Sequence, residues 1–223
     1  MVKLFDLFIE GLPLFLEGLQ VTLILTLISI FLGTVFGTLL ALGKLYGNRV
    51  VYWLTAGFIE IIRGTPLLVQ LFIFYYALPR YGIRLSAFTA AVTSFTINSA
   101  AYQAEYLRGS IQSISSGQMR AAYAIGMGKW QAIAHVVLPQ ALRRVIPSWT
   151  NEFIYLLKYT SLAYLIGTEE LMAQAKFFAG RNFQYFKVYL IAAFIYLLVV
   201  LFFSRIFSWI ENRVRIPGFE HNR

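Results

Sequence analysis

The chain has 223 residues, of which 59% are apolar, 17% aromatic and only 13% charged. A soluble domain has about 45–50% apolar and about 25% charged residues, so this composition excludes an ordinary soluble enzyme and a disordered protein and favours an integral membrane protein. Lys and Arg outnumber Asp and Glu by 19 to 10, which gives a formal net charge of +9, and the absence of cysteine excludes disulfides and thiolate-bound metals.

Five apolar segments are each long enough to cross a bilayer core, which takes about 20 helical residues. They lie at about 14–42, 51–78, 85–107, 142–166 and 186–210. We therefore predict an all-α integral membrane protein with five transmembrane helices. Gly33, Gly37 and Ala41 share one face of the first helix, and small residues at this spacing predict close packing against a second helix.

The basic residues predict the orientation of the chain in the membrane, because cytoplasmic loops carry an excess of Lys and Arg. The larger basic set has few acids beside it and consists of Lys44, Arg49, the basic residues at 108–144, Arg205, Arg213, Arg215 and Arg223. The smaller set, on the opposite side, is diluted by Asp6, Glu10, Glu169 and Glu170. We expect the N-terminus outside and the C-terminus in the cytoplasm, so the charge marks topology rather than nucleic-acid binding.

Two polar residues are expected near the middle of the membrane. Glu152 lies about nine residues beyond Arg143 and Asn98 about ten before Arg108, which places both roughly 13–15 Å inside the same boundary. Tyr102 shares a helical face with Asn98, one turn away. Because a charge at the bilayer centre costs at least about 2.5–3.5 kcal/mol, we predict a substrate pocket formed by Asn98, Tyr102 and Glu152. The alternative is a structural glutamate that a neighbouring helix satisfies.

The second apolar segment is interrupted. Glu60 and Arg63 are spaced i, i+3 and can neutralise each other on one face. Gly64 and Pro66 then break the helix, so the freed backbone groups must contact protein or line a cavity. Glu60 is a further candidate for substrate binding, and a self-paired charge beside a broken helix explains it equally well.

Two connections outside the membrane carry organised sequence. In the cytoplasmic connection, at about 109–140, a helix-prone run ends at Gly126, where glycine permits a left-handed cap, and Pro139 favours a new helix start. The pattern alone predicts either a docking surface or an interfacial helix. The external segment at about 167–183 is expected to form a short amphipathic helix, either a lid or an ordinary interfacial helix.

Four stretches, in order, resemble the membrane subunits of ABC importers for polar amino acids. They are RGTPLLVQLF (63–72), AYQAEYLRGSIQSISSGQ (101–118), LPQALRRVIPSWTNEF (138–153) and LLKYTSLAYLIG (156–167). Ala121, Ala122, Gly126 and the pair Leu138-Pro139 also match the "EAA" signature of these subunits, although Arg120 stands at the position of its glutamate. The resemblance covers almost the whole chain.

The resemblance implies one permease domain, residues 1–223, with the type I ABC importer (MetI-like) fold, in the cytoplasmic (inner) membrane of a bacterium. Such a subunit forms the path for a polar amino acid that an extracytoplasmic binding protein delivers, and the carboxylate of Glu152 favours a basic one: arginine, lysine or histidine. Its cytoplasmic loop couples to ATP-binding cassette subunits, and a second permease copy or a homologue completes a dimer. The coupling residues that it implies are Ala121, Ala122, Gly126, Met127, Lys129, Leu138 and Pro139.

The chain is not expected to be an enzyme. It contains no GxxxxGK[ST], so ATP and Mg would be bound by the partner ATPase, and we expect no catalytic residue, metal or cofactor on this chain. A stand-alone channel would need a carbonyl filter or a charge ring, and an ion-coupled carrier usually shows an internal repeat. A membrane-embedded enzyme would need an acid–base cluster, for which His135 and His221 offer little.

Overall fold

The computed structural model describes residues 3–214, which contain helices and no strand. The α-helices are α1 (Leu4–Tyr46), α2 (Arg49–Gly64), α3 (Leu67–Phe72), α4 (Ala87–Gln112), α5 (Ser116–Ala124), α6 (Lys129–Ala132), α7 (Leu138–Tyr159), α8 (Leu171–Asn182) and α9 (Tyr185–Val214). Short π or 3₁₀ segments are η1 (Ile73–Ala77), η2 (Leu78–Tyr81), η3 (Ile133–Val137) and η4 (Thr160–Ile166). Three residues discussed above, Arg215, His221 and Arg223, lie outside the described part of the chain.

Two of the described helices, α1 with 43 residues and α9 with 30, are long and apolar enough to cross a membrane. The segment Arg49–Gly64 together with Leu67–Tyr81 qualifies as a third span, although it is bent by 102°. The helices α4 and α7 occupy the third and fourth predicted spans, but their polar residues keep them below the same apolar threshold. The count of five spans therefore stays a prediction.

The helices α1 and α4 pack closely through the small residues of α1. A Cβ atom on Gly37 would lie 2.8 Å from the carbonyl oxygen of Ala100, and one on Gly33 would lie 3.0 Å from the Cβ of Ser99. Ala41 is fully buried. This contact confirms the prediction of a close helix–helix approach, which only residues without a bulky side chain permit.

The predicted break lies between α2 and α3, where Thr65 has an extended backbone before Pro66. The Nε2 amide of Gln70 donates hydrogen bonds to the carbonyl oxygens of Ile62 at 2.8 Å and Thr65 at 3.1 Å. The backbone acceptors freed by the bend are thus satisfied by a side chain of the next helix.

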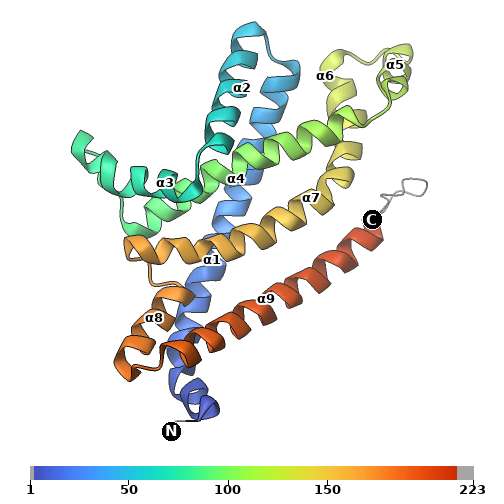
Figure 1. Cartoon of the computed structure of the whole chain (residues 1–223). Coiled ribbons are helices and arrows are strands. Elements are labelled where there is room, and N and C mark those ends of the chain that lie inside the picture. The colour runs from blue at the N-terminus through green and yellow to red at the C-terminus, as the bar shows by residue number, and fades with distance from the viewer. Residues whose placement is uncertain (1–2, 215–223) are drawn as a thin grey trace.

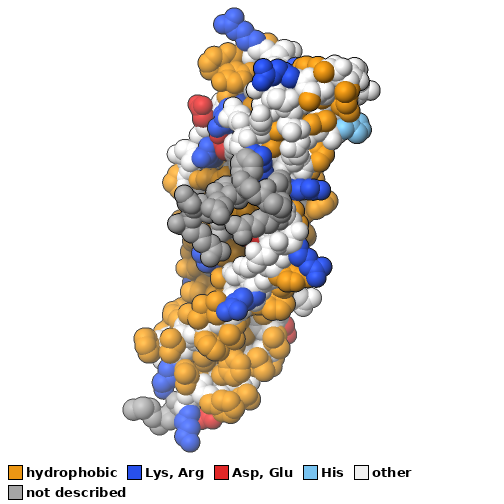
Figure 2. Space-filling model, turned by 90° about the vertical axis from the view of Figure 1, so that its right-hand side faces the viewer, with side chains coloured by type: hydrophobic (Ala, Val, Ile, Leu, Met, Phe, Trp, Pro, Cys, Tyr) orange, Lys and Arg blue, Asp and Glu red, His pale blue; other side chains and the backbone are white. Residues whose placement is uncertain are grey.

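An aromatic and aliphatic core joins α4, α7 and α9. Phe95 of α4 and Phe153 of α7 are buried together with Leu157, and Phe207 of α9 packs its ring 4.9 Å from that of Phe153. The rest of α9 diverges from α1 toward its C-terminal end (Figure 1). In Figure 2, hydrophobic side chains form a broad patch on the lower part of the face shown, and Lys and Arg side chains are scattered from its upper to its lower end.

The two connections lie at opposite ends of the molecule, with α5 and α6 at one end and α8 near the other (Figure 1). Gly126 follows α5 with φ +85°, as predicted for a left-handed cap, and Pro139 lies in the first turn of α7. The side chain of Glu170 caps α8 by accepting hydrogen bonds from the backbone N–H groups of Met172 (2.9 Å) and Ala173 (2.8 Å).

Candidate functional site

Glu152 is buried, with 7% of its surface exposed, where α7 meets α4. The hydroxyl of Tyr106 donates to its Oε2 at 3.5 Å, and Ser99 lies beside the carboxylate. The Ser99 Oγ accepts a hydrogen bond from Gln103 at 2.9 Å, so its own proton can be donated to Glu152. Among the described residues no Lys or Arg lies within ion-pair distance of Glu152. The carboxylate therefore has a hydroxyl donor in Tyr106 but no cation.

Asn98 is also buried, but it faces the break between α2 and α3. Its Nδ2 donates to the Oε1 of Gln70 at 3.2 Å. The described part of the chain contains no hydrogen bond between Asn98 and Glu152. The two residues predicted to share a pocket are thus placed on α4 and α7 but have different immediate partners.

Arg63 contacts Tyr102 rather than Glu60, and the predicted pair of Glu60 with Arg63 is wrong. The guanidinium carbon lies 5.2 Å from the centroid of the Tyr102 ring, and Nη1 lies 3.8 Å from Oε2 of Glu105. Glu60 is exposed on α2, whereas the Glu105 side chain is only 13% exposed, and a charge pair in a buried environment attracts more strongly. No described hydrogen bond or ion pair joins Glu60 to the other predicted pocket residues.

Glu105 is the centre of an ion cluster that the sequence analysis missed. Lys44 of α1 approaches its Oε1 at 2.9 Å, and Arg108 donates to its Oε2 through Nη2 at 2.8 Å and Nε at 3.0 Å. With Arg63, the carboxylate ties together α1, α2 and α4. The i, i+3 spacing of Glu105 and Arg108 was visible in the sequence, but the contacts with α1 and α2 depend on the fold.

The loop that contains α5 and α6 exposes apolar side chains that were also missed. Tyr123 is 47% exposed, Trp130 is 62% exposed and Ile125 is 75% exposed. Of the predicted coupling residues, Ala122 is buried, Met127 and Leu138 are partly buried, and the exposed ones are Ala121, Gly126, Lys129 and Pro139. Arg120 is exposed as well, so the position of the signature's glutamate faces solvent in this chain.

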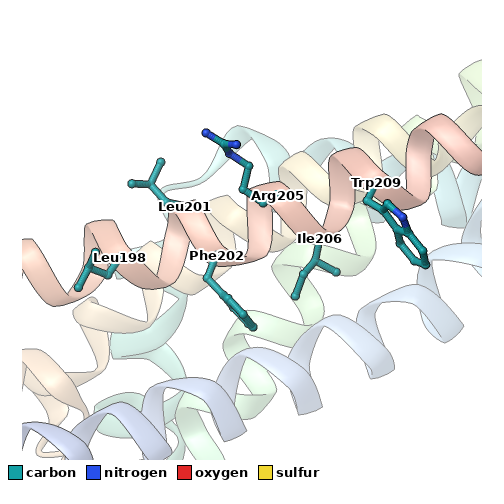
Figure 3. A pocket seen from close by; sticks show the side chains of 6 residues that line it. All are labelled: Leu198, Leu201, Phe202, Arg205, Ile206 and Trp209. Atoms are coloured by element: carbon teal, nitrogen blue, oxygen red, sulfur yellow. The ribbon is translucent and has the colours of Figure 1, made fainter.

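Two apolar pockets lie away from these polar residues. One is a shallow depression, open to the outside, on the surface of α9 alone, and its residues are Leu198, Leu201, Phe202, Arg205, Ile206 and Trp209 (Figure 3). The other, of about 620 Å³, lies between α1, α2 and α4. Neither is lined by Asn98, Tyr102 or Glu152. In the described part of the chain, no three His, Asp or Glu residues gather in a way that suits a metal ion.

Comparison with known proteins identifies the class of the chain. The profile of the family described as "Binding-protein-dependent transport system inner membrane component" matches residues 33–216. The glutamine transport system permease protein GlnP of Escherichia coli (strain K12) is 38% identical over 208 residues, which is 92% of this chain and 95% of that protein. The probable amino-acid ABC transporter permease protein YckA of Bacillus subtilis (strain 168) is 40% identical over 188 residues, which is 84% and 83% of the two chains.

Solved structures agree with the family match. A crystal structure of an amino acid ABC transporter with histidines superposes with a TM-score of 0.89 at 38% identity, covering 96% of this chain and 99% of that chain. The inward-facing MetNI methionine ABC transporter shares the fold, with a TM-score of 0.75 at 22% identity over 91% and 97% of the two chains. The predicted MetI-like helical fold is confirmed. The chain therefore belongs to the binding-protein-dependent transport system inner membrane components, and within them to the amino-acid ABC transporter permeases.

Proposed function

We propose that this chain is the membrane-spanning subunit of an ATP-driven importer of a polar amino acid. The amino acid passes between α4 and α7. Family membership supports the transport of an amino acid, and the observation in this structure that supports the path is the environment of Glu152. A buried carboxylate without a cationic partner is costly, and the positive group of a substrate removes that cost.

The proposed topology has five transmembrane segments: α1, the bent pair α2 and α3, α4, α7 and α9. The N-terminus lies outside, and the C-terminus lies in the cytoplasm of the cell. The separation of the α5–α6 loop from α8 supports this arrangement, because the basic residues near that loop mark the cytoplasmic side (Figure 1). The chain is thus a multi-pass protein of the inner membrane.

The α5–α6 loop is the proposed docking surface for a separate ATP-binding subunit, which holds ATP and Mg. Its exposed Tyr123, Ile125 and Trp130 support this role, since aromatic and apolar side chains dominate the energetics of protein interfaces. Closure of the ATPase would move the loop and, through α7, the region of Glu152. A second permease copy or a homologue completes the path, and an extracytoplasmic binding protein docks on the side of α8.

For the substrate we propose a basic amino acid: arginine, lysine or histidine. Every amino acid offers an α-ammonium group to Glu152, and a basic one offers a second positive group in its side chain. Among the relatives, GlnP is named for glutamine transport, which supports a polar amino acid as the substrate class.

Uptake by the reconstituted complex tests this proposal. The chain is co-expressed with its ATP-binding subunit, the complex is placed in vesicles loaded with ATP, and labelled amino acids are supplied with the binding protein. We expect uptake of a polar amino acid that stops when ATP is omitted. Uptake by the chain alone, driven by an ion gradient without ATP, would instead establish the stand-alone carrier and overturn the proposal.

A further inference from the structure

Arg63 forms only a long ion pair, with Glu105. Its Nη1 lies 3.8 Å from Glu105, whereas Lys44 and Arg108 approach the same carboxylate at 2.9 Å and 2.8 Å. The Arg63 side chain is 40% exposed, compared with 15% for Lys44 and 30% for Arg108. Because two closer cations already neutralise Glu105, most of the five N–H donors of Arg63 are available to another acceptor.

The same guanidinium is connected to Glu152 through two tyrosine rings. Arg63 stacks on Tyr102 at 5.2 Å, and the ring of Tyr102 lies 6.4 Å from that of Tyr106. The hydroxyl of Tyr106 in turn donates to Glu152 at 3.5 Å. A cation and an anion thus lie at the two ends of an aromatic pair on α4.

Arg63 also lies beside backbone that needs a polar environment. It is the residue before Gly64 at the end of α2, and the exposed residues Thr65 and Pro66 follow without helical structure. Non-helical backbone at membrane depth is tolerated only where it is buried in protein or lines a water-filled cavity. Gln70 already satisfies the carbonyl oxygens of Ile62 and Thr65, but Thr65 and Pro66 themselves are exposed, so this side of the break is suited to a hydrated path rather than to lipid.

An amino acid carries a carboxylate as well as an ammonium group, so a site that binds it inside the membrane must neutralise both charges. Glu152 supplies only the negative partner. We propose that Arg63 binds the α-carboxylate of the substrate while Glu152 binds a positive group, with Tyr102 and Tyr106 between them. The planar guanidinium fork matches a carboxylate with two parallel hydrogen bonds. This assignment rests on the proposed function and names the substrate group that Arg63 recognises.

The arrangement gives the Arg63 side chain one position without substrate and another with substrate bound. Without substrate, its charge is stabilised by the face of the Tyr102 ring and by the long contact with Glu105. A bound carboxylate would replace that long contact by a short charge-assisted pair, while Lys44 and Arg108 continue to neutralise Glu105. A substrate analogue without the negative charge gains nothing from this exchange, and the site therefore selects for a free α-carboxylate.

Calorimetric binding to the detergent-purified permease–ATPase complex, without the binding protein, tests the assignment. The probes are L-arginine, L-lysine, L-histidine and L-glutamine, each compared with its α-carboxamide, which keeps the ammonium group and lacks the negative charge. We expect the wild-type complex to bind an amino acid about ten- to hundred-fold more tightly than its amide, the range of a charge-assisted hydrogen bond. Arg63→Gln should weaken binding of the acid by the same factor, leave the amide unchanged and so remove the discrimination.

Two variants accompany this measurement. Arg63→Lys keeps the charge without the fork and should restore part of the discrimination. Arg49→Gln removes a positive charge from the other end of α2 and should bind like the wild type. The assignment is overturned if the wild-type complex binds acid and amide with equal affinity, or if Arg63→Gln discriminates between them as the wild type does. If Arg63→Gln fails to assemble, the comparison of acid and amide in the wild-type complex tests the assignment by itself. If the wild-type complex neither binds nor imports any of the four amino acids, the proposed function itself fails and the assignment with it.

Discussion

The amide of Asn98 donates a hydrogen bond to the side chain of Gln70 at 3.2 Å, and Gln70 in turn donates to the carbonyl oxygen of Ile62 at 2.8 Å. These two bonds connect the middle of α4 to the end of α2, across the bend that separates α2 from α3. Asn98 therefore supports the bend, whether or not it also contacts substrate. A movement of α4 would be transmitted directly to the segment that carries Arg63.

Replacing Gln70 with leucine tests this connection. Gln70→Leu keeps the volume but removes the donor to Ile62 and Thr65 and the acceptor for Asn98. A buried polar group left without a partner costs about 1–3 kcal/mol, so we expect a lower melting temperature of the purified complex and reduced ATP-driven uptake. Val69→Ala, on the exposed neighbouring position, is the control. Wild-type stability and uptake in Gln70→Leu would show that water satisfies the freed groups.

Glu152→Gln separates a ligand-binding role from a structural one. The amide keeps the shape and can still accept from Tyr106, but it lacks the negative charge. We expect the complex to assemble with near wild-type stability while the amino acid concentration for half-maximal uptake rises about tenfold or more, since a lost charge-assisted bond costs about 1.5–3 kcal/mol. Glu17→Gln, at an exposed carboxylate of α1, is the matched control.

The opposite outcome for Glu152→Gln is equally informative. If Glu152 is structural, Glu152→Gln should lower the melting temperature of the complex and leave the amino acid concentration for half-maximal uptake unchanged. Uptake and stability that both match the wild type would move the substrate path away from α7.

Features that depend on local spacing were predicted correctly from the sequence. The close approach of α1 to α4 follows from small residues that recur four apart, and the left-handed cap at Gly126 follows from a glycine after a helix-prone run. The break at Pro66 was likewise visible, because proline restricts the residue before it. Each of these features is decided by a few neighbouring residues.

Contacts between distant segments were not predictable in the same way. The i, i+3 rule assigned Arg63 to Glu60, whereas the fold brings Glu105 and Tyr102 closer to the guanidinium. The hydrogen bond from Gln70 to Asn98 also joins separate helices, and nothing in the spacing of either segment specifies it. Depth estimates placed Asn98 and Glu152 at similar levels, but depth alone does not determine which helix face each side chain occupies.

The backbone at Gly126 makes it the most sensitive position of the α5–α6 loop. Its φ of +85° is unfavourable for residues with a side chain, and a left-handed residue other than glycine costs about 1–2 kcal/mol. The turn also carries two backbone hydrogen bonds, from Gly126 N to Tyr123 O at 3.0 Å and from Met127 N to Ala122 O at 3.1 Å. A change at this position should therefore alter the shape of the proposed docking surface.

We expect Gly126→Val to lower both the recovery of the ATP-binding subunit on co-purification and ATP-driven uptake, while the membrane helices stay folded. Gly128→Ala is the control within the same loop, because its φ is −72° and an added Cβ would meet only Gln131 at 3.7 Å. Equal losses in the two variants would indicate a general effect of bulk, and normal co-purification of Gly126→Val would count against the loop as the docking surface.

The acid that caps α8 predicts a pH dependence of stability. Glu170 is fully buried, and burial raises the pKa of its carboxyl to about 7, although hydrogen bonds from Met172, Tyr196 and Ala173 oppose the shift. The folded chain thus binds this proton more tightly than an unfolded chain, in which the pKa is about 4.3. The resulting stability is fully present below about pH 4 and is lost as the pH rises through about 7, by an amount of the order of 3 kcal/mol.

Thermal unfolding of the purified complex between pH 5 and pH 8 measures this dependence. The melting temperature of the wild type should fall across that range, and Glu170→Gln, which does not titrate, should flatten the decline. Glu169→Gln removes the exposed neighbouring carboxylate and should keep the wild-type slope. If Glu170→Gln declines as steeply as the wild type, the pH dependence arises elsewhere. A decline that is lost in Glu170→Gln alone would establish that the packing of α8 against α1 and α9, which Thr22 and Tyr196 secure by hydrogen bonds, responds to pH through Glu170.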